Sequence, residues 1–151
     1  KGETKMTTTI FFDMDGTIAD VYGVENWLGY LISADALPYK VARPLLRLST
    51  LARLLNNLQK QGYRIGVISL LAKNSSAEYD KAVTEAKLGW LKKHLASVDF
   101  DEIHIVKYGT PKQTFATNET DILFDDEEKN RNNWTGKAFD VNEILEVLKG
   151  I

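Results

Sequence analysis

The chain has 151 residues, of which 44% are hydrophobic and 26% charged, a composition typical of one soluble globular domain and too apolar for a disordered chain. Nineteen basic and 21 acidic residues give a net charge of −2, which disfavours a dedicated duplex-DNA binder because such domains are usually basic. The absence of cysteine excludes disulfides, thiolate metal sites and a cysteine nucleophile, and it fits a cytoplasmic location.

The N-terminal residues carry no folding pattern. Residues 1–5 are polar and unpatterned, so we interpret them as a tag or a disordered start, with Met6 as the native first residue. The remaining residues, 6–151, have the length of a single domain. No apolar run approaches the roughly 20 residues that cross a bilayer, so no membrane partner is expected.

Short apolar runs predict the strands. Thr8–Phe12 is β-branched and aromatic and leads into a glycine-containing turn, which is typical of a fully buried strand. Similar runs lie at Ile65–Ile68, Ile103–Val106 and Ile122–Phe124, and a weaker fifth run spans Lys137–Val141.

Helical spacing of apolar residues fills the intervals. Leu48–Leu58 repeats leucine every three or four positions, and Gly62 ends that helix. A second helix covers Tyr79–Leu95, with Ser75 and Glu78 predicted as its capping box. A short helix follows at Val141–Leu148.

Strands that alternate with helices predict an α/β fold, a Rossmann-like parallel sheet sandwiched by helices. The segment Ala19–Arg47 is longer than a strand-to-helix loop needs. We predict that it forms a small helical cap over the strand ends, and an insertion that merely packs on the core is the alternative.

Polar residues follow each of the first four strands. Asp13 and Asp15 follow the first and Ser69 the second. Lys107 or Lys112 follows the third, and Asp125 with Asp126 follows the fourth. Because parallel strands end at one edge of the sheet, these side chains should converge there.

Crowded carboxylates repel one another and need a cation to remain ionised together. All-oxygen ligation suits Mg²⁺ with a phosphate, so we predict Mg²⁺ as cofactor and a small phosphorylated substrate. Asp13 would attack phosphorus, and Gly16 would let Asp15 turn back as general acid and base. Ser69 and a lysine would donate to phosphoryl oxygens. We prefer Lys112 to Lys107, because Pro111 suits a helix start aimed at the site.

The motif DMDGT at Asp13–Thr17 resembles the first motif of the haloacid dehalogenase superfamily of phosphatases. Ser69, a loop lysine and the pair Asp125–Asp126 match the other three motifs in order. The resemblance implies a phosphomonoesterase with an aspartyl-phosphate on Asp13. It further implies Mg²⁺ contact through Asp13, Asp126 and the backbone carbonyl of Asp15, with Asp125 outside the metal or holding the lysine. Receiver domains use similar residues, but in another order.

Within the superfamily, the stretch DMDGTIAD resembles the DMDGVLAD opening of the deoxyribonucleotidase-like group. The segments Lys87–Leu91 and Ile122–Asp126 resemble two further segments of that group. This resemblance implies a nucleoside monophosphate or a similarly small ester as substrate. Thr17 replaces the valine of the group, and the cap is shorter than in those enzymes.

The predicted substrate-binding residues are Gly16, Thr17, Tyr22, Trp27 and Arg43. Tyr22 and Trp27 could stack a base, although ordinary packing is equally compatible with their positions. Two alternatives stay open. A nucleic-acid 3′-phosphatase could use a basic path that includes Arg43, although the net charge does not favour it, and a non-catalytic phosphate-binding module could keep the same fold. No oligomeric state is predicted.

Overall fold

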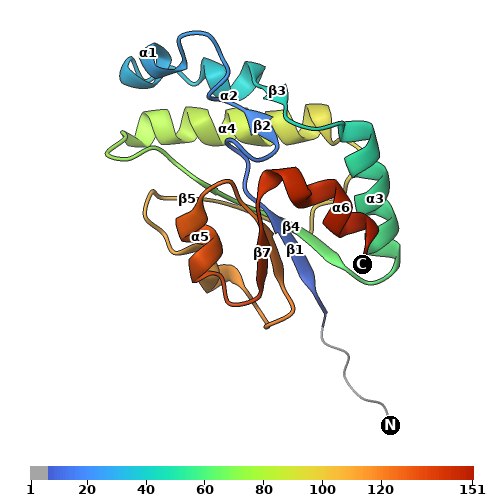
Figure 1. Cartoon of the computed structure of the whole chain (residues 1–151). Helices are drawn as coiled ribbons and strands as arrows, with labels where there is room; N and C mark the ends of the chain where they lie inside the picture. The colour runs from blue at the N-terminus through green and yellow to red at the C-terminus, as the bar shows by residue number, and fades with distance from the viewer. Residues whose placement is uncertain (1–6) are drawn as a thin grey trace.

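The computed structural model describes residues 7–151, so the predictions for residues 1–5 and for Met6 lie outside the described residues. A parallel five-stranded sheet forms its centre, in the order β5-β4-β1-β6-β7 (Figure 1). The strands are β1 (Thr9–Phe12), β4 (Arg64–Leu70), β5 (Glu102–Val106), β6 (Ile122–Phe124) and β7 (Lys137–Phe139). This confirms the predicted α/β class with a parallel sheet.

The two faces of the sheet are covered differently. On one face, alternate residues such as Phe12 and Val67 pack with side chains of α3 (Leu48–Lys60), α4 (Ala77–His94) and α6 (Ile144–Lys149) and form the main hydrophobic core. On the other face, Phe11, Ile68 and Leu123 pack with Trp134 and with the short helix η1 (Lys112–Phe115). The helix α5 (Glu128–Asn133) lies between β6 and β7 in the chain and contacts η1 and β7.

Two predicted details of the secondary structure are wrong, one at a helix cap and one at a strand end. The cap of α4 is Ser76, whose side chain accepts from the Tyr79 N–H at 3.1 Å, whereas the Ser75 hydroxyl donates to the Ala72 carbonyl at 2.9 Å. The last strand stops at Phe139, because Asp140 forms a capping box that starts η2 (Val141–Glu143). Both differences come from local side-chain hydrogen bonds that compete with the preceding backbone pattern.

A small insertion follows β1. It consists of β2 (Ala19–Asp20), α1 (Trp27–Ile32), α2 (Leu37–Val41) and β3 (Arg43–Pro44), and β2 pairs antiparallel with β3. The helix α2 packs along α4, where the buried Trp90 indole N–H donates to the Ala42 carbonyl at 2.8 Å. Figure 1 shows α1 and α2 beyond the strand ends, beside the N-terminal half of α4. Within residues 7–151, no helix has the length and apolar character that a bilayer span requires.

Candidate active site

A tight turn follows β1 and carries Asp13 and Asp15. The Met14 carbonyl accepts from the N–H groups of Thr17, Ile18 and Ala19 at 3.0–3.1 Å, which coils the chain tightly. Gly16 has φ +79°, a region that favours glycine, and a Cβ there would meet the carboxylate of Asp126. Glycine at this position therefore permits both the turn and the close approach of β1 and β6.

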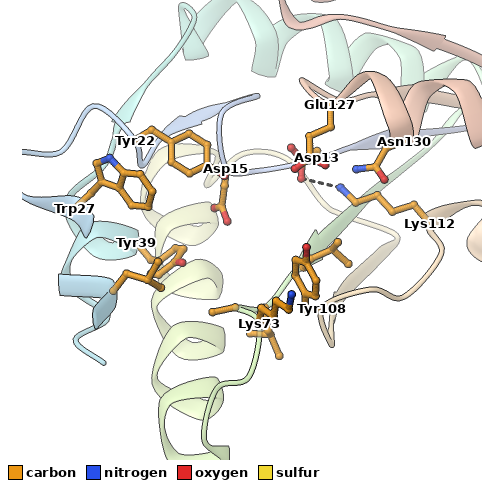
Figure 2. Close-up of a pocket in the computed structure, with 14 residues that line it drawn as sticks. Asp13, Asp15, Tyr22, Trp27, Tyr39, Lys73, Tyr108, Lys112, Glu127 and Asn130 are labelled. Carbon is orange, nitrogen blue, oxygen red and sulfur yellow. Dashed lines mark hydrogen bonds and ion pairs between the residues drawn. The ribbon is translucent and has the colours of Figure 1, made fainter. Parts of the chain in front are cut away.

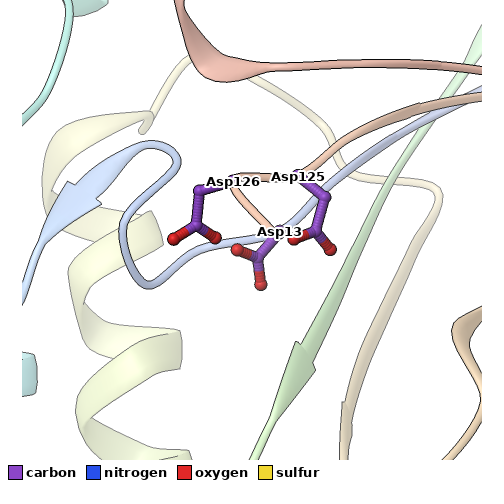
Figure 3. A group of neighbouring side chains, drawn as sticks. All are labelled: Asp13, Asp125 and Asp126. Carbon is purple, nitrogen blue, oxygen red and sulfur yellow. The ribbon is translucent and has the colours of Figure 1, made fainter. Parts of the chain in front are cut away.

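Four charged residues form what we call the core cluster: Asp13, Asp125, Asp126 and Lys112. One carboxylate oxygen from each of the three aspartates lies within 4.8 Å of the others (Figure 3). The Lys112 ammonium donates to Asp13 Oδ1 at 2.8 Å and to Asp125 Oδ2 at 2.7 Å, and it is 2% exposed. Lys112 opens η1 directly after Pro111, so the predicted helix start aims this lysine at the site.

Neighbouring groups hold the core cluster in place. The Thr17 hydroxyl donates to Asp13 Oδ2 at 2.7 Å and accepts from the Asp126 N–H at 3.1 Å. Asp125 Oδ1 accepts from the Glu127 N–H at 2.9 Å, and Oδ2 accepts from the Asn130 amide at 3.2 Å. Asp125 is therefore fully occupied in holding Lys112 and the turn after β6, whereas Asp13 and Asp126 keep capacity for a further partner.

The core cluster carries excess negative charge. With every group ionised, three carboxylates and one ammonium leave two negative charges. Burial and the nearby Asp13 carboxylate raise the pKa of Asp125 to about 6 and the pKa of Asp126 to about 8. Burial lowers the pKa of Lys112, but Asp13 and Asp125 outweigh burial and raise it overall. A divalent cation would offset this charge, and the all-oxygen donor set suits a hard ion.

A second group of residues, the cap-side cluster, consists of Asp15, Ser69, Lys87 and Tyr39. The Lys87 ammonium donates to Asp15 Oδ2 at 3.1 Å, to Ser69 Oγ at 2.6 Å and to the Leu70 carbonyl at 2.9 Å. It also lies 5.2 Å from the ring centre of Tyr39, which belongs to α2. Burial raises the pKa of Asp15, and the ion pair with Lys87 opposes that effect.

Asp13 and Asp15 line one pocket of about 300 Å³. Figure 2 shows Asp15 on the side of Tyr22, Trp27 and Tyr39, across the pocket from Asp13 and Lys112. Lys73 and Tyr108 form a further part of the wall, with the ammonium 6.0 Å from the ring centre. A negatively charged, metal-suited end thus meets an aromatic wall contributed by the cap.

Some of the predicted site residues lie at this pocket and others lie elsewhere. Lys112 lies in the core cluster, whereas the alternative Lys107 is exposed outside this pocket. Tyr22 and Trp27 both line the pocket. Arg43 does not line this pocket, because pairing with Asp20 in the β2–β3 ladder places it in a different hollow.

Three further residues of the predicted site make contacts that differ from those expected. Thr17 is buried and holds Asp13 instead of lining the pocket. Ser69 is fully buried, also outside the pocket lining, and accepts from Lys87, so its placement favours a supporting role over direct donation to a phosphoryl group. The carboxylate of Asp15 stands outside the three-carboxylate group and pairs with Lys87.

Lys87 is a residue of the site that we did not predict. Its position on α4 was the available signal, because it lies four residues after the buried Val83 and four before the buried Leu91. A lysine in the buried phase of an amphipathic helix requires an acidic or carbonyl partner.

No protein-family model and no curated protein sequence matches this chain. Solved structures do match. The crystal structure of D,D-heptose 1,7-bisphosphate phosphatase from Burkholderia thailandensis aligns with a TM-score of 0.51 and 15% identity, over 83% of this chain and 70% of that chain. A chain of the Pnkp1/Rnl/Hen1 complex aligns with a TM-score of 0.57 and 19% identity, over 92% of this chain and 47% of that chain. The protein therefore shares its fold with these structures, and the predicted Rossmann-like parallel sheet sandwiched by helices is confirmed.

Proposed function

We propose that this protein is a divalent-metal-dependent phosphomonoesterase that works through a phosphoryl group on Asp13. The observation that carries this proposal is the position of Asp13. Its carboxylate ends the central strand, contacts the Lys112 ammonium and belongs to a group of three carboxylates beside a pocket that also contains Asp15. A carboxylate nucleophile needs such neutralisation before it can approach a phosphate dianion.

The chemistry has two steps. An Asp13 oxygen attacks phosphorus while the bond to the ester oxygen breaks, and Asp15 gives its proton to that leaving oxygen. Asp15 then accepts a proton from water, whose oxygen attacks phosphorus, and the bond between phosphorus and Asp13 breaks. Inorganic phosphate leaves, Asp13 is regenerated and Asp15 holds a proton for the next cycle.

Mg²⁺ is the cation that we propose for the core cluster, held by Asp13 and Asp126. When bound, it would neutralise charge on the phosphoryl oxygens. Asp125 and Lys112 support this arrangement by fixing Asp13 from the other side. We retain the prediction that the Asp15 backbone carbonyl also faces the cation.

The pocket supports a nucleoside monophosphate, or a similarly small ester, as substrate. Its volume of about 300 Å³ lies at the small end for ligand pockets. Its wall contains Tyr22, Trp27 and Tyr39, and aromatic rings of this kind can stack a nucleobase. The charged end would take the phosphate and the aromatic side the base.

A nucleic-acid 3′-phosphatase is the second candidate, since one structural neighbour comes from the Pnkp1/Rnl/Hen1 complex. A polynucleotide would need a basic track that leads out of the pocket. The basic residues among those lining this pocket are Lys73 and Lys112, and Lys112 is already paired with two carboxylates. We therefore favour the smaller substrate.

The decisive assay measures phosphate release with Mg²⁺ from nucleoside monophosphates, sugar phosphates and 3′-phosphorylated oligonucleotides. We expect turnover of the nucleotides, loss of turnover in EDTA and recovery when Mg²⁺ is added back. Salt-sensitive turnover of the oligonucleotide alone would favour the end-processing alternative. Phosphate binding without turnover of any ester would indicate a non-catalytic module.

A further inference from the structure

Lys87 lies in the middle of α4, and its side chain is 1% exposed. A buried ammonium is costly unless its protons are donated to good acceptors. Lys87 has three such acceptors: Asp15 Oδ2, Ser69 Oγ and the Leu70 carbonyl. These acceptors come from the turn after β1 and from the end of β4, so the lysine joins α4 to the two chain segments beside the pocket.

The three acceptors use all three N–H groups of the ammonium. Lys87 has no proton left to donate to a substrate, and it is absent from the residues that line the pocket. Its influence on a reaction must therefore pass through a residue that it holds. Three of its partners line the pocket, namely Asp15, Leu70 and Tyr39. Of these three, Asp15 is the one whose side chain is a carboxylate that can carry a proton to a leaving oxygen.

The two oxygens of Asp15 have different surroundings. Oδ2 accepts from Lys87, whereas Oδ1 is buried and has no hydrogen-bond partner among the described residues. A buried acceptor without a partner is costly, so its retention points to a partner that arrives with the substrate. Anchoring Oδ2 fixes the rotation of the carboxyl group and leaves Oδ1 as the oxygen available for proton transfer.

We infer that Lys87 is a positioning residue that aims Asp15 at the leaving oxygen, and that Ser69 braces the lysine. This inference rests on the proposed phosphomonoesterase function and assigns parts to two residues of the same site. Tyr39 completes the arrangement by covering the ammonium from the cap side.

The test compares two esters that differ in leaving group. An alkyl phosphate, such as a nucleoside 5′-monophosphate, needs a proton on the departing oxygen, whereas 2,4-dinitrophenyl phosphate leaves without one. We expect Lys87→Met to lower kcat/KM about 10²–10³-fold for the alkyl ester, which is the lower part of the range of about 10²–10⁴-fold for one general acid, and less than about tenfold for the aryl ester. Ser69→Ala should shift the two esters in the same direction by a smaller factor. Lys81→Met, on an exposed position of the same helix, is the matched control.

A double-mutant cycle makes the assignment specific. In an Asp15→Asn background, Lys87→Met should cause little further loss for the alkyl ester, because the group that it positions is already gone. A purely structural role predicts equal losses for both esters, and the same loss with or without Asp15. Either result would overturn the inference.

The cysteine-free sequence allows a rescue experiment, should Lys87→Met fail to fold. In Lys87→Cys the single thiol can be alkylated with 2-bromoethylamine in denaturant, and refolding then restores a lysine analogue at this position. We expect the alkyl-ester activity to return, while a Lys81→Cys protein treated in parallel stays unchanged. Failure of properly refolded, aminoethylated protein to regain activity would contradict the inference. If the wild-type protein hydrolyses no ester, the proposed function falls with it, whereas wild-type turnover with equal losses contradicts only the role of Lys87.

Discussion

The core cluster and the cap-side cluster each contain one buried lysine, but their charge balance differs. In the core cluster Lys112 contacts two of three grouped carboxylates, so two negative charges remain when every group is ionised, whereas Lys87 pairs with the single carboxylate of Asp15 and no charge remains. We therefore expect the core cluster to attract a divalent cation and the cap-side cluster to be stable without one. Two aspartates separated by one residue thus receive different environments: Asp13 faces the metal-suited group and Asp15 an ammonium.

Asp13 and Asp15 also differ in how firmly the two oxygens of each carboxyl group are held. Both carboxylate oxygens of Asp13 are held, one by Lys112 and one by Thr17, which fixes the orientation of the proposed nucleophile. Asp15 is held through one oxygen only, and burial raises its pKa. Carboxyl groups placed in unlike surroundings can divide the roles of nucleophile and proton carrier between them.

Removing the nucleophile should have the largest effect. We expect Asp13→Asn to lose at least about 10⁴-fold in kcat, because an amide is a far poorer nucleophile. The fold should be as stable as the wild type or slightly more so, since one charge leaves a crowded group. Phosphatase assays and thermal unfolding test both parts, with the exposed Asp99→Asn as control.

Acid-quenched wild-type protein should carry the phosphoryl group on Asp13. Peptide mapping that found the group on Ser69, or undiminished turnover by Asp13→Asn, would refute the assignment of Asp13.

Neutralising each lysine in turn tests the charge comparison directly. Lys112→Met should destabilise the fold by about 3–5 kcal/mol, because it strands Asp13 and Asp125 without their cation. Lys87→Met strands one carboxylate that can take up a proton, so we expect about 1–3 kcal/mol. Urea unfolding measures both losses, and Lys107→Met, at an exposed position, is the control.

Added Mg²⁺ should recover part of the stability of Lys112→Met and leave the deficit of Lys87→Met unchanged, since ligand binding stabilises only the state that holds it. Equal recovery of the two variants would contradict the view that the cation belongs to the core cluster alone.

The two clusters differ in how far the sequence predicts them. Each carboxylate of the core cluster directly follows a short apolar strand, so parallel topology was enough to bring Asp13, Asp125 and Asp126 together. Pro111 supplied the local signal for Lys112. These predictions needed only the order of strands and the edge at which they end.

The surroundings of Lys87 and Arg43 could not be predicted from the spacing of residues in the sequence. The partners of Lys87 become apparent only when the rotation of α4 about its axis and the path of the Asp13–Ala19 turn are both known. Arg43 lies outside the pocket, because its antiparallel pairing with Asp20 places this part of the cap at a different hollow. The start of α4 and the end of β7 differ from the prediction for a related reason. A single hydroxyl hydrogen bond sets the cap at Ser76, and carboxylate hydrogen bonds set the cap at Asp140.

A smaller effect concerns the contact between the β1 turn and the core cluster. Gly16→Ala combines backbone strain of about 1–3 kcal/mol with a methyl group pressed against the Asp126 carboxylate and the Tyr22 ring. Gly62→Ala is the matched control, because Gly62 has φ +102° but no neighbouring atom within 4 Å of the added carbon. Both variants should lose stability, and only Gly16→Ala should weaken Mg²⁺ activation. Calorimetric Mg²⁺ titrations that gave equal affinities for the two variants would contradict this expectation.

The smallest effect should come from the aromatic wall next to the cap-side cluster, far from the reacting bond. Trp27 lines the pocket and meets Tyr22 edge-on, with ring centres 5.1 Å apart. Stacking of one base is worth about 1–3 kcal/mol, so Trp27→Ala should raise KM for a nucleoside monophosphate about 5- to 100-fold with little change in kcat. Ribose 5-phosphate, which has no base, should show the same KM with both proteins. Leu28→Ala, at the adjacent exposed position outside the pocket lining, should behave as the wild type. Equal changes in KM for both esters would mean that Trp27 shapes the cap without contacting a base, and the choice of a nucleotide substrate would then lose its support.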